Sequence, residues 1–183
     1  SYCRLFGLSY EQIPLNDDFL VSVESYSKQN GGVILPNPNA PTGIDLGLTA
    51  IRKLLENQSE QVVVIDEAYY AYSDRHHLEW IRRYDNVVIV RTLSKQGFAG
   101  IRLGMLIAKQ AWLDEFNKVR MPYNINVLTQ ATAEFVADAW VPLGLEAGQL
   151  AENRQELRDS LVELGLEVFP SQANFLVVRT AHE

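Results

Sequence analysis

The sequence predicts an α/β domain built around a mostly parallel β-sheet. Short runs of branched apolar residues recur along the chain, and segments whose apolar residues repeat with a helical period lie between them. Strands that alternate with helices are typical of parallel sheets covered by helices. The chain has 183 residues, of which 47% are hydrophobic and 21% are charged. It is therefore long enough for an ordinary domain, and its composition excludes wholesale disorder.

The predicted strands are four apolar runs, at residues 33–35, 62–65, 87–90 and 103–108. The runs at 62–65 and 87–90 contain no polar residue, which is typical of strands covered on both faces. Two more extended segments are expected near the end of the chain, at residues 168–170 and 175–178.

The predicted helices carry apolar residues on one face. In the first of them this face consists of Leu48, Ile51, Leu54 and Leu55. Two more helices are expected at residues 111–119 and 128–139, and Pro142 is expected to stop the second because proline cannot continue a helix. A longer helix with a leucine stripe follows, and it is expected to end near Gly165.

Composition excludes several classes of function. Asp and Glu outnumber Lys and Arg by 23 to 16, and a net charge of −7 makes the chain a poor binder of nucleic acid or anionic membranes. No apolar run approaches the ~18–20 residues that a transmembrane helix needs. The single cysteine, Cys3, cannot form an internal disulfide and is typical of a reducing compartment, so a cytoplasmic protein is expected.

Polar side chains follow the predicted strands at the points where the strands end. In open α/β sheets, ligands bind beyond the carboxyl ends of the strands. A loop with three prolines, residues 36–43, follows the first strand. The candidate side chains after the next two strands are Asp66, Tyr69, Thr92, Ser94, Lys95 and Arg102. A carboxylate, a lysine, hydroxyls and an arginine at one edge suit a ligand with a basic nitrogen and a phosphate.

Four segments carry a resemblance to a known family. In chain order they are residues 37–43 (Asn-Pro-Asn-Ala-Pro-Thr-Gly), 66–69 (Asp-Glu-Ala-Tyr), 92–95 (Thr-Leu-Ser-Lys) and 100–104 (Gly-Ile-Arg-Leu-Gly). Their order and spacing resemble those of pyridoxal-phosphate-dependent aminotransferases of fold type I. Residues 122–126 and 170–175 resemble the histidinol-phosphate aminotransferase branch. The resemblance implies a three-layer α/β fold, pyridoxal 5'-phosphate as cofactor, and amino transfer between glutamate and imidazole-acetol phosphate in histidine biosynthesis.

The resemblance also implies roles for three of the candidate residues. Lys95 would carry the cofactor as an imine, and its freed amine would then move a proton as general acid and base. Asp66 would pair with the pyridine nitrogen and keep it protonated, so that the ring can accept electrons. Tyr69 would hydrogen-bond the phenolic oxygen of the ring. No metal ion is implied.

The phosphate would be held by Thr92, Ser94 and Arg102, since the planar fork of arginine suits a phosphate. Lys95 and Arg102 are seven residues apart, one fewer than in the usual family pattern. This spacing predicts a tightened loop in which Gly97 absorbs the change.

A second departure from the family pattern lies in the proline-rich loop. Family members commonly carry an asparagine directly before Pro-Thr-Gly, where it contacts the phenolic oxygen of the cofactor, but this chain has Ala40 there. Tyr69 is therefore expected to be the main protein partner of that oxygen. The Ala40–Pro41 bond is also a candidate cis peptide.

The resemblance further predicts the domain organisation. Residues 1–142 would belong to the cofactor-binding large domain, and residues 143–183 would form an interdomain helix and the start of a small α+β C-terminal domain. In relatives, a phosphate-binding glycine loop and a ring-stacking aromatic residue come earlier, and a carboxylate-binding arginine comes later. We therefore expect a longer, homodimeric protein that acts on small-molecule amino acids and keto acids. We also expect the 183 residues alone to bind the cofactor weakly and to show no transamination.

Other interpretations stay open at this point. Aromatic amino acid aminotransferases and threonine-phosphate decarboxylases share the same motifs. The run at 62–65 with Asp66 and Glu67 also resembles the acidic motif of P-loop ATPases, although the phosphate-binding motif of that class is absent from residues 1–61. A catalytically inactive domain kept for assembly is a third interpretation, and the presence of Lys95 argues against it.

Two further groups have a structural interpretation, which for Tyr69 stands beside its role at the cofactor. His76 and His77 are expected to form a surface pair rather than a metal site, because adjacent histidines point apart. Tyr69, Tyr70 and Tyr72 are expected to be partly a packed aromatic ridge.

Overall fold

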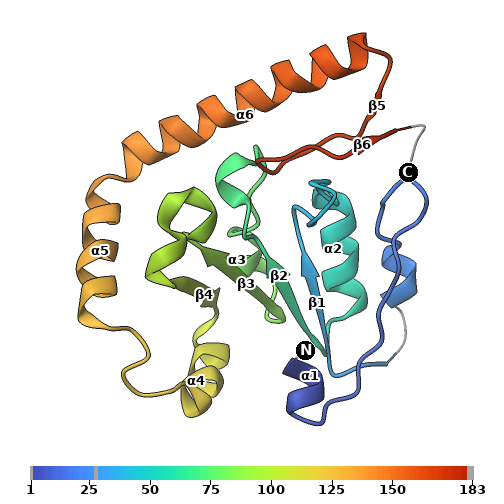
Figure 1. Ribbon diagram of the computed structural model, residues 1–183. Helices are drawn as coiled ribbons and strands as arrows, with labels where there is room; N and C mark the ends of the chain where they lie inside the picture. Colours follow the sequence, from blue (N-terminus) through green and yellow to red (C-terminus); the bar gives the residue numbers. More distant parts are fainter. Residues whose placement is uncertain (1, 27–28, 181–183) are drawn as a thin grey trace.

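The centre of the fold is a four-stranded sheet with three parallel strands. Its strands, in spatial order, are β1 (Gly32–Pro36), β2 (Val62–Asp66), β3 (Val87–Thr92) and β4 (Gly104–Ala108) (Figure 1). β1, β2 and β3 pair in parallel, whereas β4 pairs antiparallel with β3. The predicted mostly parallel sheet is therefore confirmed. The structure is a computed structural model that describes residues 2–26 and 29–180, so the chain ends at Ser1 and at residues 181–183 lie outside the described residues.

Helix α2 (Leu48–Asn57) covers one face of the sheet and forms the main core with it. Ile51, Leu54 and Leu55 are fully buried, as their shared helical face predicts. They cluster with the buried strand residues Val33, Leu35, Val63, Ile65, Val87 and Ile89. Burying one such aliphatic side chain contributes roughly 1.5–3 kcal/mol relative to leaving it exposed. This cluster therefore holds the three parallel strands side by side.

The opposite face of the first two strands is more open than predicted. Val62 and Val64 are only half-buried, and Ile34 is 73% exposed. Side chains alternate between the two faces along a strand, and α2 covers the face to which Val63 and Ile65 point. The prediction that the run at 62–65 is covered on both faces is therefore wrong for the described residues.

Two helices of the second half of the chain confirm the predicted segments. They are α4 (Gln110–Val119) and α5 (Val127–Asp138). Pro142 does not stop α5, as had been predicted from the sequence. It lies instead in the first turn of the next helix, α6 (Trp140–Glu163), where a backbone N–H has no partner within the helix. The division of domains at residues 142 and 143 stays a prediction.

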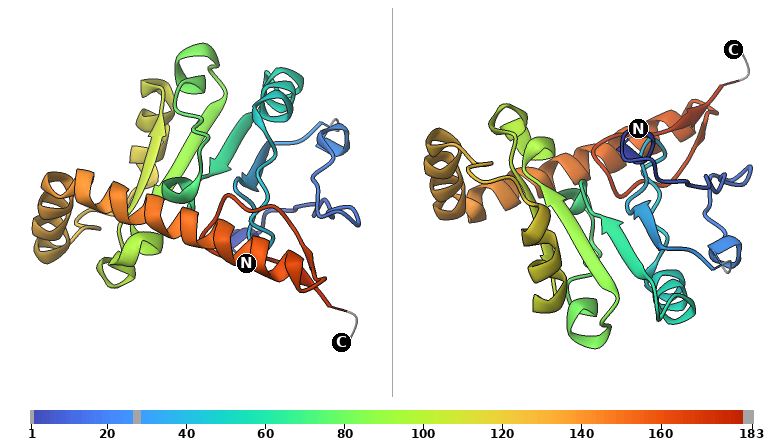
Figure 2. Two further views of the ribbon diagram at one scale, coloured as in Figure 1. Left: turned by 90° about the horizontal axis from the view of Figure 1, so that it is seen from above. Right: turned by 90° about the horizontal axis from the view of Figure 1, so that it is seen from below.

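Helix α6 runs across one end of the sheet, and Figures 1 and 2 show it passing the strand ends. At that end it packs against the short turn η2 (Tyr70–Tyr72). Gly165, with a φ of +84°, follows the end of α6, as predicted. A long rigid element thus lies beside the strand ends at which the candidate residues were expected.

Short elements complete the fold. A two-stranded antiparallel sheet near the end of the chain pairs β5 (Glu167–Val168) with β6 (Val178–Arg179), so only the last residue of the extended run predicted at 175–178 is part of a strand. No helix within residues 2–26 and 29–180 is long and apolar enough to cross a membrane. The remaining elements are α1 (Tyr2–Leu5), η1 (Val23–Tyr26), α3 (Trp80–Arg83), η3 (Ser94–Phe98) and η4 (Ala99–Ile101).

Candidate active site at the ends of the parallel strands

Asp66 is the last residue of β2 and is fixed by the sheet itself. Its carbonyl accepts from the Asn37 amide at 2.9 Å, and the next amide, that of Glu67, donates to the Val90 carbonyl at 2.8 Å. The Asp66 carboxylate accepts from the Ala68 amide at 3.0 Å, which turns the chain away from the strand. The carboxylate is half-buried, and burial raises the pKa of Asp66, while the Ala68 amide and the charge of Lys95 oppose that rise.

Tyr69 follows in the turn that β2 leads into. Its ring makes an edge-to-face contact with the Phe175 ring, with the ring centroids 5.1 Å apart. Phe175 belongs to the 170–175 segment singled out in the sequence, so that distant segment packs directly against the candidate site. Such edge contacts between aromatic rings stabilise one ring orientation over others.

Lys95 lies in η3, a single helical turn of π type directly after β3. Its Nζ lies 5.4 Å from the centroid of the Tyr69 ring, and its charge acts on the Asp66 carboxyl. Strand pairing explains this meeting, because β2 and β3 run in parallel and end at the same edge of the sheet. The three residues to which the resemblance gives the chemistry are therefore neighbours.

The amine of Lys95 differs in its surroundings from the other lysines that the structure describes. Lys53, Lys109 and Lys118 each form an ion pair with a surface carboxylate. The Lys95 amine lies instead over an aromatic ring, on a side chain that is exposed to solvent. It is thus accessible to an incoming aldehyde.

Thr92 and Ser94 form a pair of hydroxyls beside Lys95. The two oxygens are 3.0 Å apart, and Thr92 Oγ1 also accepts from the Ser94 amide at 3.1 Å. Thr92 Oγ1 lies 3.1 Å from the Leu103 carbonyl, which ties the start of the lysine turn to the chain that enters β4. The two hydroxyls lie at the end of β3 and in the turn directly after it, and the Ser94 hydroxyl is a suitable donor to an anionic group.

Arg102 lies at the other end of the loop that follows β3. Its side chain is exposed, and its Nη1 donates to the Ala99 carbonyl at 3.1 Å. The residue itself has a φ of +54°, a left-handed conformation that the sequence did not predict for an arginine. Gly97 has a φ of +89° within the lysine turn, which agrees with the expectation that this glycine absorbs the short spacing.

The proline-rich loop after β1 is held by its own side chains. The Asn39 side chain donates from Nδ2 to Thr42 Oγ1 at 2.7 Å and is therefore bound within the loop. Two backbone hydrogen bonds of Asn39, with Ile44 and Gly43, close the loop. Ala40 is exposed and carries no donor. The predicted cis peptide at Ala40–Pro41 is confirmed, and Asn37–Pro38 is also cis.

The segment at 170–175 lies against this loop. The Gln172 amide donates to the Gly43 carbonyl at 2.7 Å. Gly43 has a φ of +77°, and a Cβ at this position would lie 2.9 Å from the Ser171 Cβ. Only glycine therefore allows the two segments to approach so closely. Sequence reasoning marked residues 170–175 as a family motif but did not predict this contact.

A buried ionic cluster lies directly behind the candidate site. Glu67 is 1% exposed, and its carboxylate accepts from Arg91 Nε at 2.8 Å. The same carboxylate accepts from the His77 amide at 3.0 Å and lies 2.7 Å from His77 Nδ1. The prediction of a surface histidine pair is therefore wrong for His77, which is 1% exposed, although His76 is exposed. The burial of His77 depends on Glu67, which is ten residues away in the sequence, and the pairing of two adjacent histidines does not reveal this contact.

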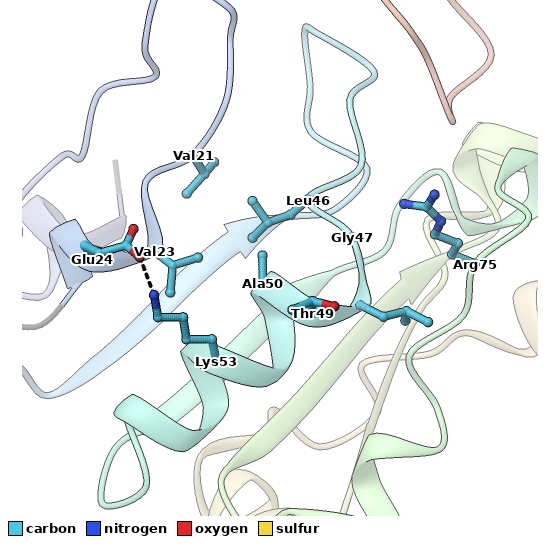
Figure 3. Close-up of a pocket in the computed structure, with 10 residues that line it drawn as sticks. Val21, Val23, Glu24, Leu46, Gly47, Thr49, Ala50, Lys53 and Arg75 are labelled. Atoms are coloured by element: carbon cyan, nitrogen blue, oxygen red, sulfur yellow. Dashed lines mark hydrogen bonds and ion pairs between the residues drawn. The ribbon is translucent and has the colours of Figure 1, made fainter.

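A pocket elsewhere on the surface does not compete with this site. It lies between residues 21–24 and the start of helix α2, and none of the candidate site residues lines it (Figure 3). The two cations that line it, Lys53 and Arg75, are paired with Glu24 and Asp45. Both of these cations are therefore already matched by carboxylates within the protein.

Known proteins to which this chain is similar include aminotransferases. The family model for aminotransferase class I and II matches residues 1–183. A histidinol-phosphate aminotransferase of Gluconacetobacter diazotrophicus is 41% identical over 184 residues, which cover 97% of this chain and 51% of that protein. Histidinol-phosphate aminotransferase 1 of Burkholderia lata is 42% identical over 182 residues, with 96% and 51% covered.

The chain spans about half the length of the curated relatives it matches. Among solved structures, a histidinol-phosphate aminotransferase from Sinorhizobium meliloti in complex with pyridoxal-5'-phosphate superposes with a TM-score of 0.84 at 24% identity. This match covers 96% of the chain and 50% of the solved chain, and it shows a shared fold.

Proposed function

The chain belongs to the aminotransferase class I and II family, and we propose that it supplies the cofactor-binding centre of a histidinol-phosphate aminotransferase. The curated relatives that carry this name are about two-fifths identical over nearly the whole chain. The observation that carries the proposal is the meeting of Lys95, Asp66 and Tyr69 at one edge of the sheet. The P-loop ATPase interpretation is set aside, because the family model covers all the residues on which it rested.

The described residues fit pyridoxal phosphate in their chemistry. An aldehyde needs an amine that is accessible and not tied to a carboxylate, and Lys95 is exposed with its Nζ over an aromatic ring. A pyridine nitrogen needs a carboxylate that is shielded from water, and Asp66 is half-buried at the end of β2. The phosphate needs donors, which Thr92 and Ser94 offer beside the lysine.

When bound, pyridoxal phosphate supplies an electron sink for the pair released at the substrate Cα. The protein must hold and move protons around it. We propose that Asp66 holds the proton on the ring nitrogen, and that Lys95 moves the proton at the substrate Cα after its amine is freed. Burial by itself raises the pKa of Asp66, and a positive charge on the ring nitrogen would oppose that rise strongly, because a charge pair is less screened away from water.

Tyr69 is proposed to donate to the phenolic oxygen of the cofactor. In this chain it would do so without help from the loop after β1, since Ala40 has no donor and the side chain of Asn39 bonds to Thr42. The edge contact with Phe175 limits the orientation of the Tyr69 ring. Arg102 is proposed as a further ligand of the phosphate, in addition to the two hydroxyls.

The substrates and the assembly follow from the relatives and are part of the proposal. We propose that the whole protein exchanges an amino group between glutamate and imidazole-acetol phosphate, as a cytoplasmic homodimer. The names of the matching curated relatives favour this substrate over the aromatic amino acids and over decarboxylation of a phosphothreonine.

The experiment that tests the proposal uses borohydride. The whole protein is purified and mixed with pyridoxal phosphate, its absorbance is recorded, and the complex is reduced and mapped by peptide mass spectrometry. The label is expected on Lys95, and a panel of amino donors and keto acids then identifies the substrates. A label found on Lys53, Lys109 or Lys118 alone would refute the proposed centre.

A further inference from the structure

Two tyrosines of turn η2 follow Asp66 and Tyr69 in the chain and are not among the proposed site residues. Tyr70 and Tyr72 are each 5% exposed, whereas Tyr69 is half-buried. Both hydroxyls reach the turn that carries Lys95. Tyr72 donates to the Lys95 carbonyl, and Tyr70 accepts from Gln96 Nε2 at 2.8 Å. Residues 95 and 96 are thus both held from the side of the site on which Asp66 lies.

Tyr70 is in turn anchored by the buried ionic cluster. The Arg91 guanidinium lies 4.2 Å from the centroid of the Tyr70 ring. Arg91 is bound to Glu67, the residue directly after Asp66. A continuous set of contacts therefore runs from Glu67 through Arg91 and Tyr70 to Gln96, and it connects the two strand ends that bear Asp66 and Lys95.

Tyr72 is anchored from helix α6 and from the segment at 170–175. Arg154 of α6 donates to the Tyr72 carbonyl at 3.3 Å and to the Ala173 carbonyl at 2.6 Å. The Tyr72 hydroxyl also interacts with the side chain of Asn174. The Tyr72 hydroxyl, like any tyrosine, keeps its proton at neutral pH and stays a donor, and burial raises its pKa further.

We propose that Tyr70 and Tyr72 are positioning residues that fix the Lys95 turn relative to Asp66 and Tyr69. The inference rests on the proposed function, because it takes Lys95 as the cofactor-bearing residue. A lysine side chain is long and flexible, so the reach of its amine depends on where its backbone is held. A misplacement of about 1 Å at a reacting group can slow a reaction by on the order of 10²-fold. The Tyr72 hydroxyl holds the Lys95 backbone and the Tyr70 hydroxyl holds the side chain of the next residue, Gln96, and together these two contacts limit that freedom.

The test replaces each hydroxyl while keeping the ring. Tyr70→Phe and Tyr72→Phe each remove one hydrogen bond to the lysine turn, and Tyr84→Phe is the matched control, because Tyr84 donates to Glu56 at the surface. In cofactor-free protein, amide exchange of residues 94–98 is expected to become about two- to tenfold faster in the first two variants, the effect of losing one ordinary hydrogen bond. The control should exchange like the wild type.

A second readout uses the cofactor. With pyridoxal phosphate, the Tyr70→Phe and Tyr72→Phe proteins should form the borohydride-stable bond at Lys95 about two- to tenfold more slowly, and the pH midpoint of the absorbance of the bound cofactor should shift. If a tyrosine only stabilised the fold, its replacement would leave the labelling rate and the pH midpoint unchanged in the fraction of the variant that is folded. Gln96→Leu removes the same contact as Tyr70→Phe from its other partner, and it should reproduce that effect even if Tyr70→Phe folds poorly.

The outcomes separate the two proposals. If the wild type is labelled at Lys95 but the tyrosine variants and Gln96→Leu match it in exchange, rate and midpoint, the positioning role is wrong and the proposed function stands. If the whole wild-type protein gains no label at Lys95, the proposed function is wrong. The exchange of residues 94–98 in the cofactor-free protein then still decides whether the two hydroxyls hold the turn.

Discussion

The replacement Glu67→Gln should destabilise the fold more than any surface substitution. Glu67 is 1% exposed, and its two oxygens face donors on opposite sides. Oε2 accepts from Arg91, with contacts of 2.8 Å and 2.7 Å, and Oε1 faces the amide and Nδ1 of His77. A glutamine has a single carbonyl oxygen, so its NH₂ group must face donors on one side or the other.

The size of the effect follows from the charge that is left behind. Arg91 is 9% exposed and would lose its counter-charge in the Glu67→Gln protein. Removing one partner of a buried ion pair costs about 3–5 kcal/mol, a large part of the ~5–15 kcal/mol that keeps a typical domain folded. The control is Glu56→Gln, because the Glu56 side chain is exposed to water. It accepts a hydrogen bond from the Tyr84 hydroxyl and lies 3.9 Å from Arg52 Nε. Its cost should be below about 1 kcal/mol.

The cost of Glu67→Gln should also depend on pH. Burial by itself would raise the pKa of Glu67, but the hydrogen bond from His77 and the charge and hydrogen bonds of Arg91 outweigh burial and lower it from 4.5. A carboxyl whose pKa is lowered by folding contributes stability above its unfolded pKa and loses it as the pH falls through the folded value. The difference between wild type and variant should therefore be constant near neutral pH and shrink below pH 4.5.

Urea unfolding followed by circular dichroism at several pH values measures both quantities. A second variant, Glu67→Leu combined with Arg91→Leu, removes the charge pair together and should be more stable than Glu67→Gln, since no buried charge is left alone. The reasoning is refuted if Glu67→Gln costs no more than Glu56→Gln, or if its cost is unchanged well below pH 4.5.

Three more outcomes are expected at the proposed site. Lys95→Ala should lose the borohydride-stable attachment of pyridoxal phosphate, whereas Lys109→Ala should keep it; equal labelling of both proteins would contradict the assignment. Asp66→Asn should still take up the cofactor but slow the single-turnover proton transfer by roughly 10²-fold or more, because an amide does not hold the proton on the ring nitrogen; an unchanged rate would exclude this role. Ala40→Asn should reduce the effect of Tyr69→Phe on the pH titration of the bound cofactor, since asparagine adds a second donor; no interaction between the two substitutions would show that residue 40 does not reach the phenolic oxygen.

The sequence was sufficient to predict which strand ends come together. Asp66 and Lys95 each follow an uninterrupted apolar run, and parallel strands end at one edge of the sheet. The predicted runs match β2 and β3 closely because such branched apolar residues have few alternatives to a buried strand. The resemblance then added chemical roles, which neither periodicity nor composition contains.

The sequence was a poorer guide where an outcome depends on tertiary contacts. Pro142 reads equally well as the end of one helix or the start of another, and a single residue, Ala139, separates α5 from α6. Burial of His77 depends on Glu67 and Arg91, which meet it only in the folded chain. Phe175 lies in a run that favours a strand, yet its ring packs on Tyr69 and the strand begins later, at Val178.

The adjacency of Asp66 and Glu67 explains why the site and the buried cluster are linked. Consecutive residues at a strand end point to opposite sides, so two carboxylates side by side in sequence take different roles. Asp66 stays half-buried beside Lys95, while Glu67 turns inward to Arg91. Each carboxylate faces a cation from the β3 side of the fold. Lys95 acts on Asp66, and Arg91 binds Glu67. A change at Glu67 should accordingly be felt at Asp66 through their shared peptide unit, and at Lys95 through Arg91 and the turn that Tyr70 holds.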